Sequence, residues 1–195
     1  MRTRTRALLL ALGALIVAAP VSAGTGTAAV TVDEYTFTAA TITIVAGDKV
    51  QWTNAGTFEH TVTSDGTLGL LSIDLPSGSD GTHTFSTAGT FAYHCSIHAS
   101  MKGKVRVPIT ATPSAGAAGT TFTITLGTAA APAGYRYVVQ RRAPGGSFVA
   151  WKTTGAQTLT VPLTKKGKWA FRSRLKRTSN GALSAFSPVA TITVS

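Results

Sequence analysis

The sequence predicts an all-β protein made of two β-domains. Short runs rich in Thr, Val and Ile alternate with polar residues between turns of Gly, Pro, Asn and Asp, whereas no long segment has apolar residues at helical spacing. The chain has 195 residues, of which 44% are hydrophobic, and this is enough for two small domains. All seven acidic residues precede residue 109, and residues 109–195 contain eleven basic residues and no acid. Such a change in composition favours two domains that meet near Pro108.

Residues 1–23 have the pattern of a secretory signal peptide. Three arginines lie within the first six residues, an apolar run follows at 7–19, and Pro20 and small residues come next. The run is too short to span a bilayer, which takes about 20 apolar residues. We therefore expect cleavage close to Ala23 and a secreted or extracytoplasmic protein, in the periplasm or at the cell surface, with no membrane span after cleavage.

The first domain, expected at 24–108, is predicted to contain seven strands. Each is a short run in which alternate residues are apolar, and turn residues bound it. The expected strands lie at 30–37, 41–44, 49–53, 60–64, 82–86, 90–95 and 102–107.

The second domain, expected at 109–195, shows the same period of two. The turn at 143–146 predicts a hairpin between its third and fourth strands. Seven strands in this length match the size of an immunoglobulin-like sandwich. The expected strands lie at 109–112, 122–126, 135–142, 148–153, 159–163, 169–175 and 190–194. Because almost no linker separates the domains, we expect them to abut.

The cysteine content restricts the chemistry of the chain. Cys95 is the only cysteine, which excludes an internal disulfide, a zinc site of several thiolates, an iron–sulfur cluster and a binuclear copper centre with two bridging thiolates. In an oxidising compartment an unpaired thiol needs protection, and a metal ion provides it.

The segment YHCSIHASMKG at 93–103 places three metal-ligand types within seven positions: Cys95, His98 and Met101. A trigonal copper site uses one Cys sulfur and two His nitrogens in a plane, with a long axial bond to a Met sulfur. His60, in the stretch FEHTVTSDG, is the candidate for the second imidazole. Taken singly, each residue has an ordinary structural explanation, since a lone Cys or Met in a β-domain is most often a core residue.

The span VAGDKVQWTN…HTVTSDG…FSTAGTFAYHCSIHASMKGKVRV resembles the cupredoxins, and within them the small plastocyanin and amicyanin type, over about residues 30–108. The resemblance implies an eight-stranded Greek-key β-sandwich that holds one copper ion, which cycles between Cu(I) and Cu(II). The implied ligands are His60, Cys95, His98 and Met101, with electrons passing through the exposed edge of His98. Polar groups that support the ligands are then expected at Thr61 and Ser96. His94 directly precedes Cys95, so strand alternation points its side chain to the opposite face.

The second domain resembles a fibronectin type III domain in the stretch YRYVVQRRAPGGSFVAWKTT…GKWAFRSRLKRTSNGALSAFSPVATITVS. Alternation along its sixth strand points Trp169, Phe171 and Leu175 inward and four basic residues outward. The expected basic surface, a candidate site for polyanions, consists of Arg141, Arg142, Lys165, Lys166, Lys168, Arg172, Arg174 and Lys176. The alternative is that these charges only solvate the sandwich. With neither acids nor histidines, this domain has no means for conventional hydrolysis.

These observations favour an exported blue copper protein that carries single electrons between redox partner proteins, localised by its basic domain. We expect no enzymatic activity, because four protein ligands leave no open copper position for a substrate. The basic domain suits an anionic cell-wall polymer or polysaccharide, and export argues against nucleic acid as a partner. The alternative function is a cell-surface or polyanion-binding module whose first domain buffers or delivers copper.

Overall fold

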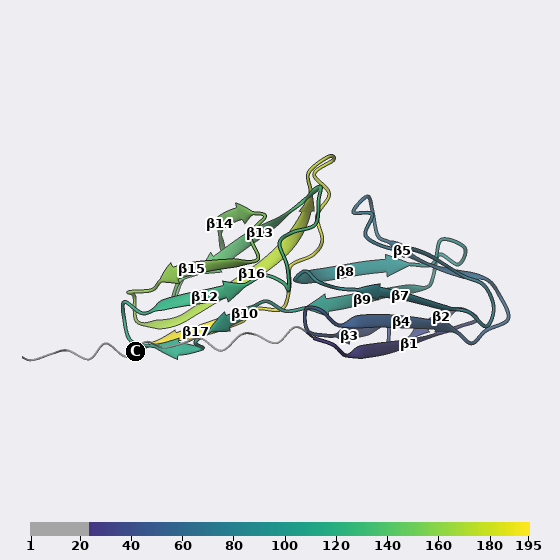
Figure 1. The fold of residues 1–195 in the computed structure, drawn as a ribbon, viewed down its shortest axis with the longest axis horizontal. Coiled ribbons are helices and arrows are strands. Elements are labelled where there is room, and N and C mark those ends of the chain that lie inside the picture. The colour runs from purple at the N-terminus through teal and green to yellow at the C-terminus, as the bar shows by residue number, and fades with distance from the viewer. Residues whose placement is uncertain (1–23) are drawn as a thin grey trace, which may run out of the picture.

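The computed structural model describes residues 24–195, so the expected signal peptide at 1–23 lies outside the described residues. Within the described range the chain forms seventeen strands and no α-helix (Figure 1), in agreement with the predicted all-β class. Accordingly, no helix there is long and apolar enough to cross a membrane.

The first half of the described chain is a pair of sheets with strand orders β2-β1-β4-β7 and β3-β9-β8-β5-β6. Two of the pairings, β1 with β4 and β3 with β9, are parallel, as crossing connections between the sheets require. The strands are Thr27–Asp33 (β1), Thr36–Thr38 (β2), Thr41–Thr43 (β3), Lys49–Asn54 (β4), His60–Ser64 (β5), Ser72–Leu75 (β6), Asp80–Thr84 (β7), Gly89–His94 (β8) and Lys102–Val107 (β9).

The second half is another pair of sheets, with orders β10-β12-β15 and β11-β17-β16-β13-β14. Its strands are Thr110–Thr112 (β10), Ala115–Gly116 (β11), Thr121–Thr125 (β12), Tyr135–Arg142 (β13), Val149–Thr154 (β14), Thr158–Pro162 (β15), Gly167–Arg177 (β16) and Ala190–Val194 (β17).

Apart from shifts of one or two residues at several strand ends, the observed strands differ from the predicted ones in three places. The run expected as one strand at 30–37 is two strands, β1 and β2, because the chain turns at Glu34 and Tyr35. The four-residue β6 and the two-residue β11 were not predicted. The first half therefore has nine strand segments within residues 24–108, where the resemblance implied eight, and the second half has eight where seven were expected.

Aromatic side chains form the centre of the first sandwich. Trp52 and Tyr93 are fully buried, and their rings meet edge to face with centroids 5.5 Å apart. Tyr93 makes a second edge-to-face contact with Phe37, at 4.9 Å. Such pairs are worth about 0.5–1.5 kcal/mol beyond their burial. This cluster lies beneath the end of β8, and so it supports the residues that follow β8.

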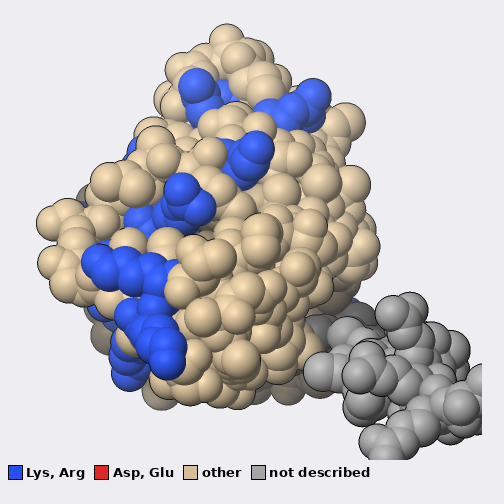
Figure 2. Space-filling view, turned by 90° about the vertical axis from the view of Figure 1, so that its left-hand side faces the viewer, with Lys and Arg blue, Asp and Glu red and all other residues tan. Residues whose placement is uncertain are grey.

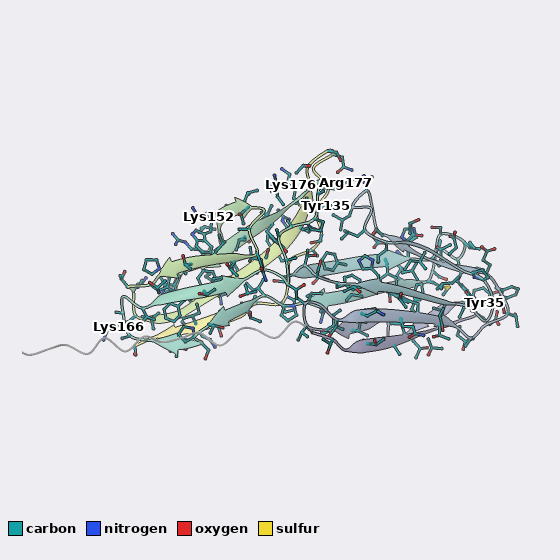
Figure 3. The ribbon with its side chains drawn as sticks, viewed as in Figure 1. Tyr35, Tyr135, Lys152, Lys166, Lys176 and Arg177 are labelled. Atoms are coloured by element: carbon teal, nitrogen blue, oxygen red, sulfur yellow. The ribbon has the colours of Figure 1, made fainter. Side chains whose placement is uncertain are left out.

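The two halves abut (Figure 1). Hydrogen bonds cross the junction from two separate segments. Thr90 on β8 exchanges backbone hydrogen bonds with Ala185, of 3.0 and 3.1 Å. The loop between β5 and β6 is held from the other side (Figure 3), where the Tyr135 hydroxyl donates to the Leu68 carbonyl at 2.8 Å and Arg177 donates to the Thr67 carbonyl at 3.2 Å. The halves are therefore joined by backbone and side-chain bonds rather than by a linker alone.

Gly103 generates a prediction about stability. It pairs with Tyr93 across β8 and β9, and a Cβ at this position would collide with the Tyr93 ring. We expect Gly103→Ala to lower the free energy of unfolding by about 1–3 kcal/mol, because the buried ring has no free space into which to move. Gly155→Ala is the matched control, since its Cβ would make an ordinary 3.7 Å contact. Urea unfolding followed by circular dichroism measures both, and equal stability of the two variants would contradict the argument.

Candidate metal centre

Three side chains that the sequence singled out meet at the end of the first half that lies far from the junction. His60 is the first residue of β5, Cys95 directly follows β8, and His98 lies in the loop between β8 and β9. The three form a group of candidate ligand atoms that lie within 4.8 Å of one another. Met101, the last residue of the same loop, is 1% exposed.

The distances between the donor atoms suit a metal ion. His60 Nδ1 and His98 Nδ1 are 3.1 Å apart, and each lies 3.8 Å from Cys95 Sγ. Bonds of roughly 2.0–2.2 Å to a metal between them, at angles of about 100–120°, would place the ligand atoms about 3.1–3.8 Å apart. One thiolate sulfur and two imidazole nitrogens at this spacing fit one copper ion.

Backbone hydrogen bonds close the loop that carries the later ligands. The Cys95 amide donates to the Met101 carbonyl at 3.1 Å, and the Met101 amide donates to the His98 carbonyl at 3.0 Å. The loop is therefore a compact turn that continues the β8–β9 ladder. Its ligand positions are fixed by the sheet.

The Cys95 sulfur also connects the loop to β5. The Thr61 amide donates to Cys95 Sγ at 3.3 Å, and the Ser96 amide donates to Thr61 Oγ1 at 2.8 Å. Two hydroxyl contacts complete this network, from Thr63 to Thr61 at 3.0 Å and from Ser96 to Thr63 at 2.9 Å. Thr61 and Ser96, which the resemblance implied as supports, thus lie next to the sulfur. Thr63 is a third member that sequence reasoning missed.

A buried asparagine, also missed from the sequence, shapes the segment that leads to His60. Asn54 is 1% exposed, and its Nδ2 donates to the carbonyls of Phe58 and Leu75 at 2.8 and 2.9 Å. Its Oδ1 accepts the Gly56 amide at 3.0 Å. The side chain thereby satisfies the backbone of a loop that has no ladder of its own. In the sequence, an Asn at the end of a predicted strand could have indicated this role.

Electrostatics favour the neutral form of His60. Burial lowers the pKa of His60, the charge of the neighbouring His98 lowers it further, and Glu34 and Asp33 act in the opposite direction. The ordinary pKa of a histidine is about 6.5, so the His60 imidazole is neutral near pH 7. A neutral imidazole has the free nitrogen lone pair that metal binding requires.

Three apolar side chains surround His98 at the surface. Tyr35, Phe58 and Ile97 are 56%, 48% and 51% exposed, which is unusual for residues of their size. The Tyr35 ring meets the His98 imidazole edge to face at 5.3 Å, and the Phe58 ring lies 6.1 Å from it. Figure 3 labels Tyr35 at this end of the molecule. Nothing in the sequence pattern predicted this patch, because its members come from three separate loops.

His94 lies outside the cluster, as alternation predicted. Its Nδ1 is 2.7 Å from the Asp65 carboxylate, which accounts for the residue as a partner in a hydrogen-bonded pair. His83 lies on β7, where its ring packs against the Phe85 ring with centroids 4.7 Å apart.

The structure places the residues of the expected basic surface at three locations. Arg142, Lys168, Arg172, Arg174 and Lys176 occupy the outward face of the five-stranded sheet of the second half. Arg141 pairs with the buried Phe171 and therefore leaves from the other face, with its guanidinium over Trp151 and Trp169. Lys165 and Lys166 lie in the turn before β16. Figure 2 shows Lys and Arg side chains spread across this end of the molecule with no acidic side chain in view.

Comparisons with known proteins identify a family for this chain. A family model described as a cupredoxin-like domain matches residues 6–107. The chloroplastic plastocyanin of Tetradesmus obliquus is 36% identical over 83 residues, which cover 36% of this chain and 57% of that protein. This chain thus spans little more than half the length of that curated relative.

Solved structures of similar proteins match part of this chain. A reduced amicyanin variant is 30% identical, with 42% of this chain and 82% of that chain covered at a TM-score of 0.38. A purple cupredoxin from Nitrosopumilus maritimus is 24% identical, with 41% and 98% covered at the same TM-score.

The hydroxyl of Thr61 generates a second prediction. In Thr61→Val the Ser96 amide loses its acceptor in a part-buried position, so we expect the metal-free protein to lose about 1–2 kcal/mol of unfolding free energy. Thr61→Ser keeps the hydroxyl and is expected to retain most of the stability. Urea unfolding of the metal-free variants provides the measurement. A Val variant as stable as wild type would show that the bond does not hold the ligand loop.

Proposed function

The chain belongs to the cupredoxin-like family, and from this premise we propose that it is an exported copper protein that carries single electrons between redox partner proteins. The observation that carries the proposal is the convergence of His60 Nδ1, His98 Nδ1 and Cys95 Sγ within 3.8 Å of one another. When bound there, copper supplies one-electron oxidation and reduction between Cu(II) and Cu(I).

The four side chains have different roles in holding the ion. His60 and His98 would hold the ion through imidazole nitrogens and Cys95 through its sulfur, and the buried Met101 would offer its thioether sulfur as a weaker donor. The Thr61 amide donates a hydrogen bond to Cys95 Sγ at 3.3 Å and so fixes the position of the sulfur. Because this amide and the closed loop are part of the sheet, they would hold the donors in place in both oxidation states, so that little reorganisation would accompany electron transfer.

His98 is the group through which electrons enter and leave. Its imidazole is half-buried, whereas His60 is fully buried, so of the two imidazoles only His98 reaches the surface. The patch of Tyr35, Phe58 and Ile97 around it offers a partner protein an apolar surface for close approach. Such a patch allows a short-lived complex that excludes water from the space between the two redox centres.

A carrier role follows from the same ligand set. Four protein donors leave no open position for a substrate, which argues against catalysis at the metal. The alternative is a surface module whose first half buffers or delivers copper without redox partners. Rapid electron exchange with a small redox protein would favour the carrier, and copper transfer without such exchange would favour the alternative.

The second half localises the protein in this proposal. Residues 109–195 hold eleven basic residues and no acid, and they resemble a fibronectin type III domain. A surface of this charge attracts polyanions. In an extracytoplasmic location the available polyanion is an anionic polymer or polysaccharide of the cell wall rather than nucleic acid.

A copper titration tests the electron carrier. One equivalent of Cu(II) should give the wild-type protein an intense visible absorption, because the copper–thiolate bond produces it, and Cys95→Ser should abolish this absorption even if some copper still binds. His83→Gln removes an imidazole outside the site and should leave the colour unchanged. Absorption and paramagnetic resonance spectra report the result. If wild-type protein stays colourless, the first half has the shape of a cupredoxin without its metal site.

A salt series tests the localisation. The mature full-length chain should be retained on a heparin column at low salt, and retention should fall steeply as salt is added, because charges are screened and counterions released. Elution at low salt, as for a neutral protein, would show that the basic residues only solvate the sandwich.

A further inference from the structure

Three arginines and two phenylalanines alternate on the outward face of the second half. We call this set the Arg–Phe stack: Arg142, Phe148, Arg172, Phe186 and Arg174. The Arg172 guanidinium carbon lies 4.1 Å from the ring centroids of both Phe148 and Phe186. Arg142 lies over Phe148 at 5.0 Å, and Arg174 lies over Phe186 at 4.4 Å. Each ring therefore carries two guanidinium groups.

The central guanidinium of the stack is fixed in place. Arg172 donates from Nε and Nη2 to the Gln140 side-chain oxygen at 2.9 and 2.7 Å, and Gln140 is its partner across β13 and β16. Arg174 follows two residues later on the same face, about 7 Å further along the strand. With Nε and Nη2 engaged, Nη1 of Arg172 remains available to a ligand, held at a defined spacing from the next guanidinium.

Carboxylates do not compensate the charge of the stack. Within residues 24–195 the one ion pair is that of His94 with Asp65, which belongs to the first half. Burial lowers the pKa of Arg172, and the charges of Arg174 and Arg142 lower it further. Three cations held this close repel one another, and a bound anion would relieve the repulsion.

The stack continues into a cleft between the two halves. Phe186, which carries Arg172 and Arg174, is also a wall of this cleft, whose volume is about 360 Å³. The opposite wall comes from β9 of the first half and brings two more cations, Lys104 and Arg106. Phe186 thus contacts basic groups of the second half and lines the same cleft as two basic groups of the first half.

We propose that the Arg–Phe stack and the adjoining cleft are the binding site for a linear anionic polysaccharide. The inference rests on the proposed localisation by an anionic polymer and gives it a site and a recognition chemistry. Guanidinium groups bind carboxylate, sulfate or phosphate groups through paired N–H donors, and stacking on phenyl rings presents their edges to such groups.

The geometry favours a polysaccharide over the other polyanions. Single-stranded nucleic acids gain much of their affinity by stacking bases on free aromatic faces, and here guanidinium groups occupy the faces of both rings. A membrane presents a flat surface, which does not enter a cleft, whereas a single polymer chain lies along it.

The test compares two variants of the full mature chain with heparin as the probe. Arg172→Lys keeps the net charge but removes the planar fork, and we expect it to raise the Kd for heparin roughly tenfold at physiological salt. Lys152→Gln removes one charge from the same sheet outside the stack, and it should raise the Kd by less than about threefold. Phe186→Leu, which keeps every charge and removes one ring, should weaken binding as Arg172→Lys does.

The outcomes separate this inference from the proposed localisation. If Lys152→Gln weakens binding more than Arg172→Lys and Phe186→Leu do, attraction is by diffuse charge, and the stack is not the site although localisation stands. If wild-type protein does not bind heparin at all, both fail. Tighter binding of single-stranded DNA than of heparin, lost in Arg172→Lys, would overturn the choice of polysaccharide. Urea unfolding followed by circular dichroism, with the same transition as wild type, checks that the second half of each variant is folded.

Discussion

The hydrogen bond from the Thr61 amide to the Cys95 sulfur joins the two segments on which the whole metal centre depends. One ligand lies on β5 and the others lie in the loop after β8, thirty-five positions later in the chain, so two pieces of backbone must meet with little error. The 3.3 Å contact fixes their separation, and Thr61 Oγ1 secures the next residue of the loop. Below them the buried rings of Trp52 and Tyr93 hold β4 and β8 in place. Ligand geometry in this protein is thus a property of the sheet.

Much of the fold could be predicted because the strands alternate cleanly. The predicted strands at 60–64, 102–107, 135–142 and 190–194 have the observed bounds. The prediction failed where short-range pattern carries too little information. At Glu34 and Tyr35 a turn interrupts an otherwise extended run, and β6, with polar Ser72 and Asp74 on its outer side, is held by its pairing with β5 rather than by a strong pattern of its own.

The candidate site divides in the same way. The sequence predicted Cys95, His98 and Met101 as members of the site, because residues that lie within seven positions of one another in the chain also lie close together in space. Asn54, Thr63 and the exposed rings of Tyr35 and Phe58 could not be found so, since their roles depend on segments brought together by the fold. The arrangement of the basic residues could not be predicted from the sequence either. The structure separates Arg141, which pairs with Phe171 and leaves from the other face, from the Arg–Phe stack, which forms around Phe148 and Phe186.

The end-to-end arrangement of the two halves has a consequence for how the protein meets its surroundings. Residues 24–108 contain seven acidic and four basic residues and therefore carry a net negative charge, whereas all charged residues of 109–195 are basic. Tyr35, beside His98, and Lys166 lie toward opposite ends of the long axis (Figure 3). The molecule is therefore an electric dipole along its length. Near a negatively charged surface it experiences a torque that turns the basic end inward, which leaves the imidazole edge of His98 directed outward toward diffusing proteins.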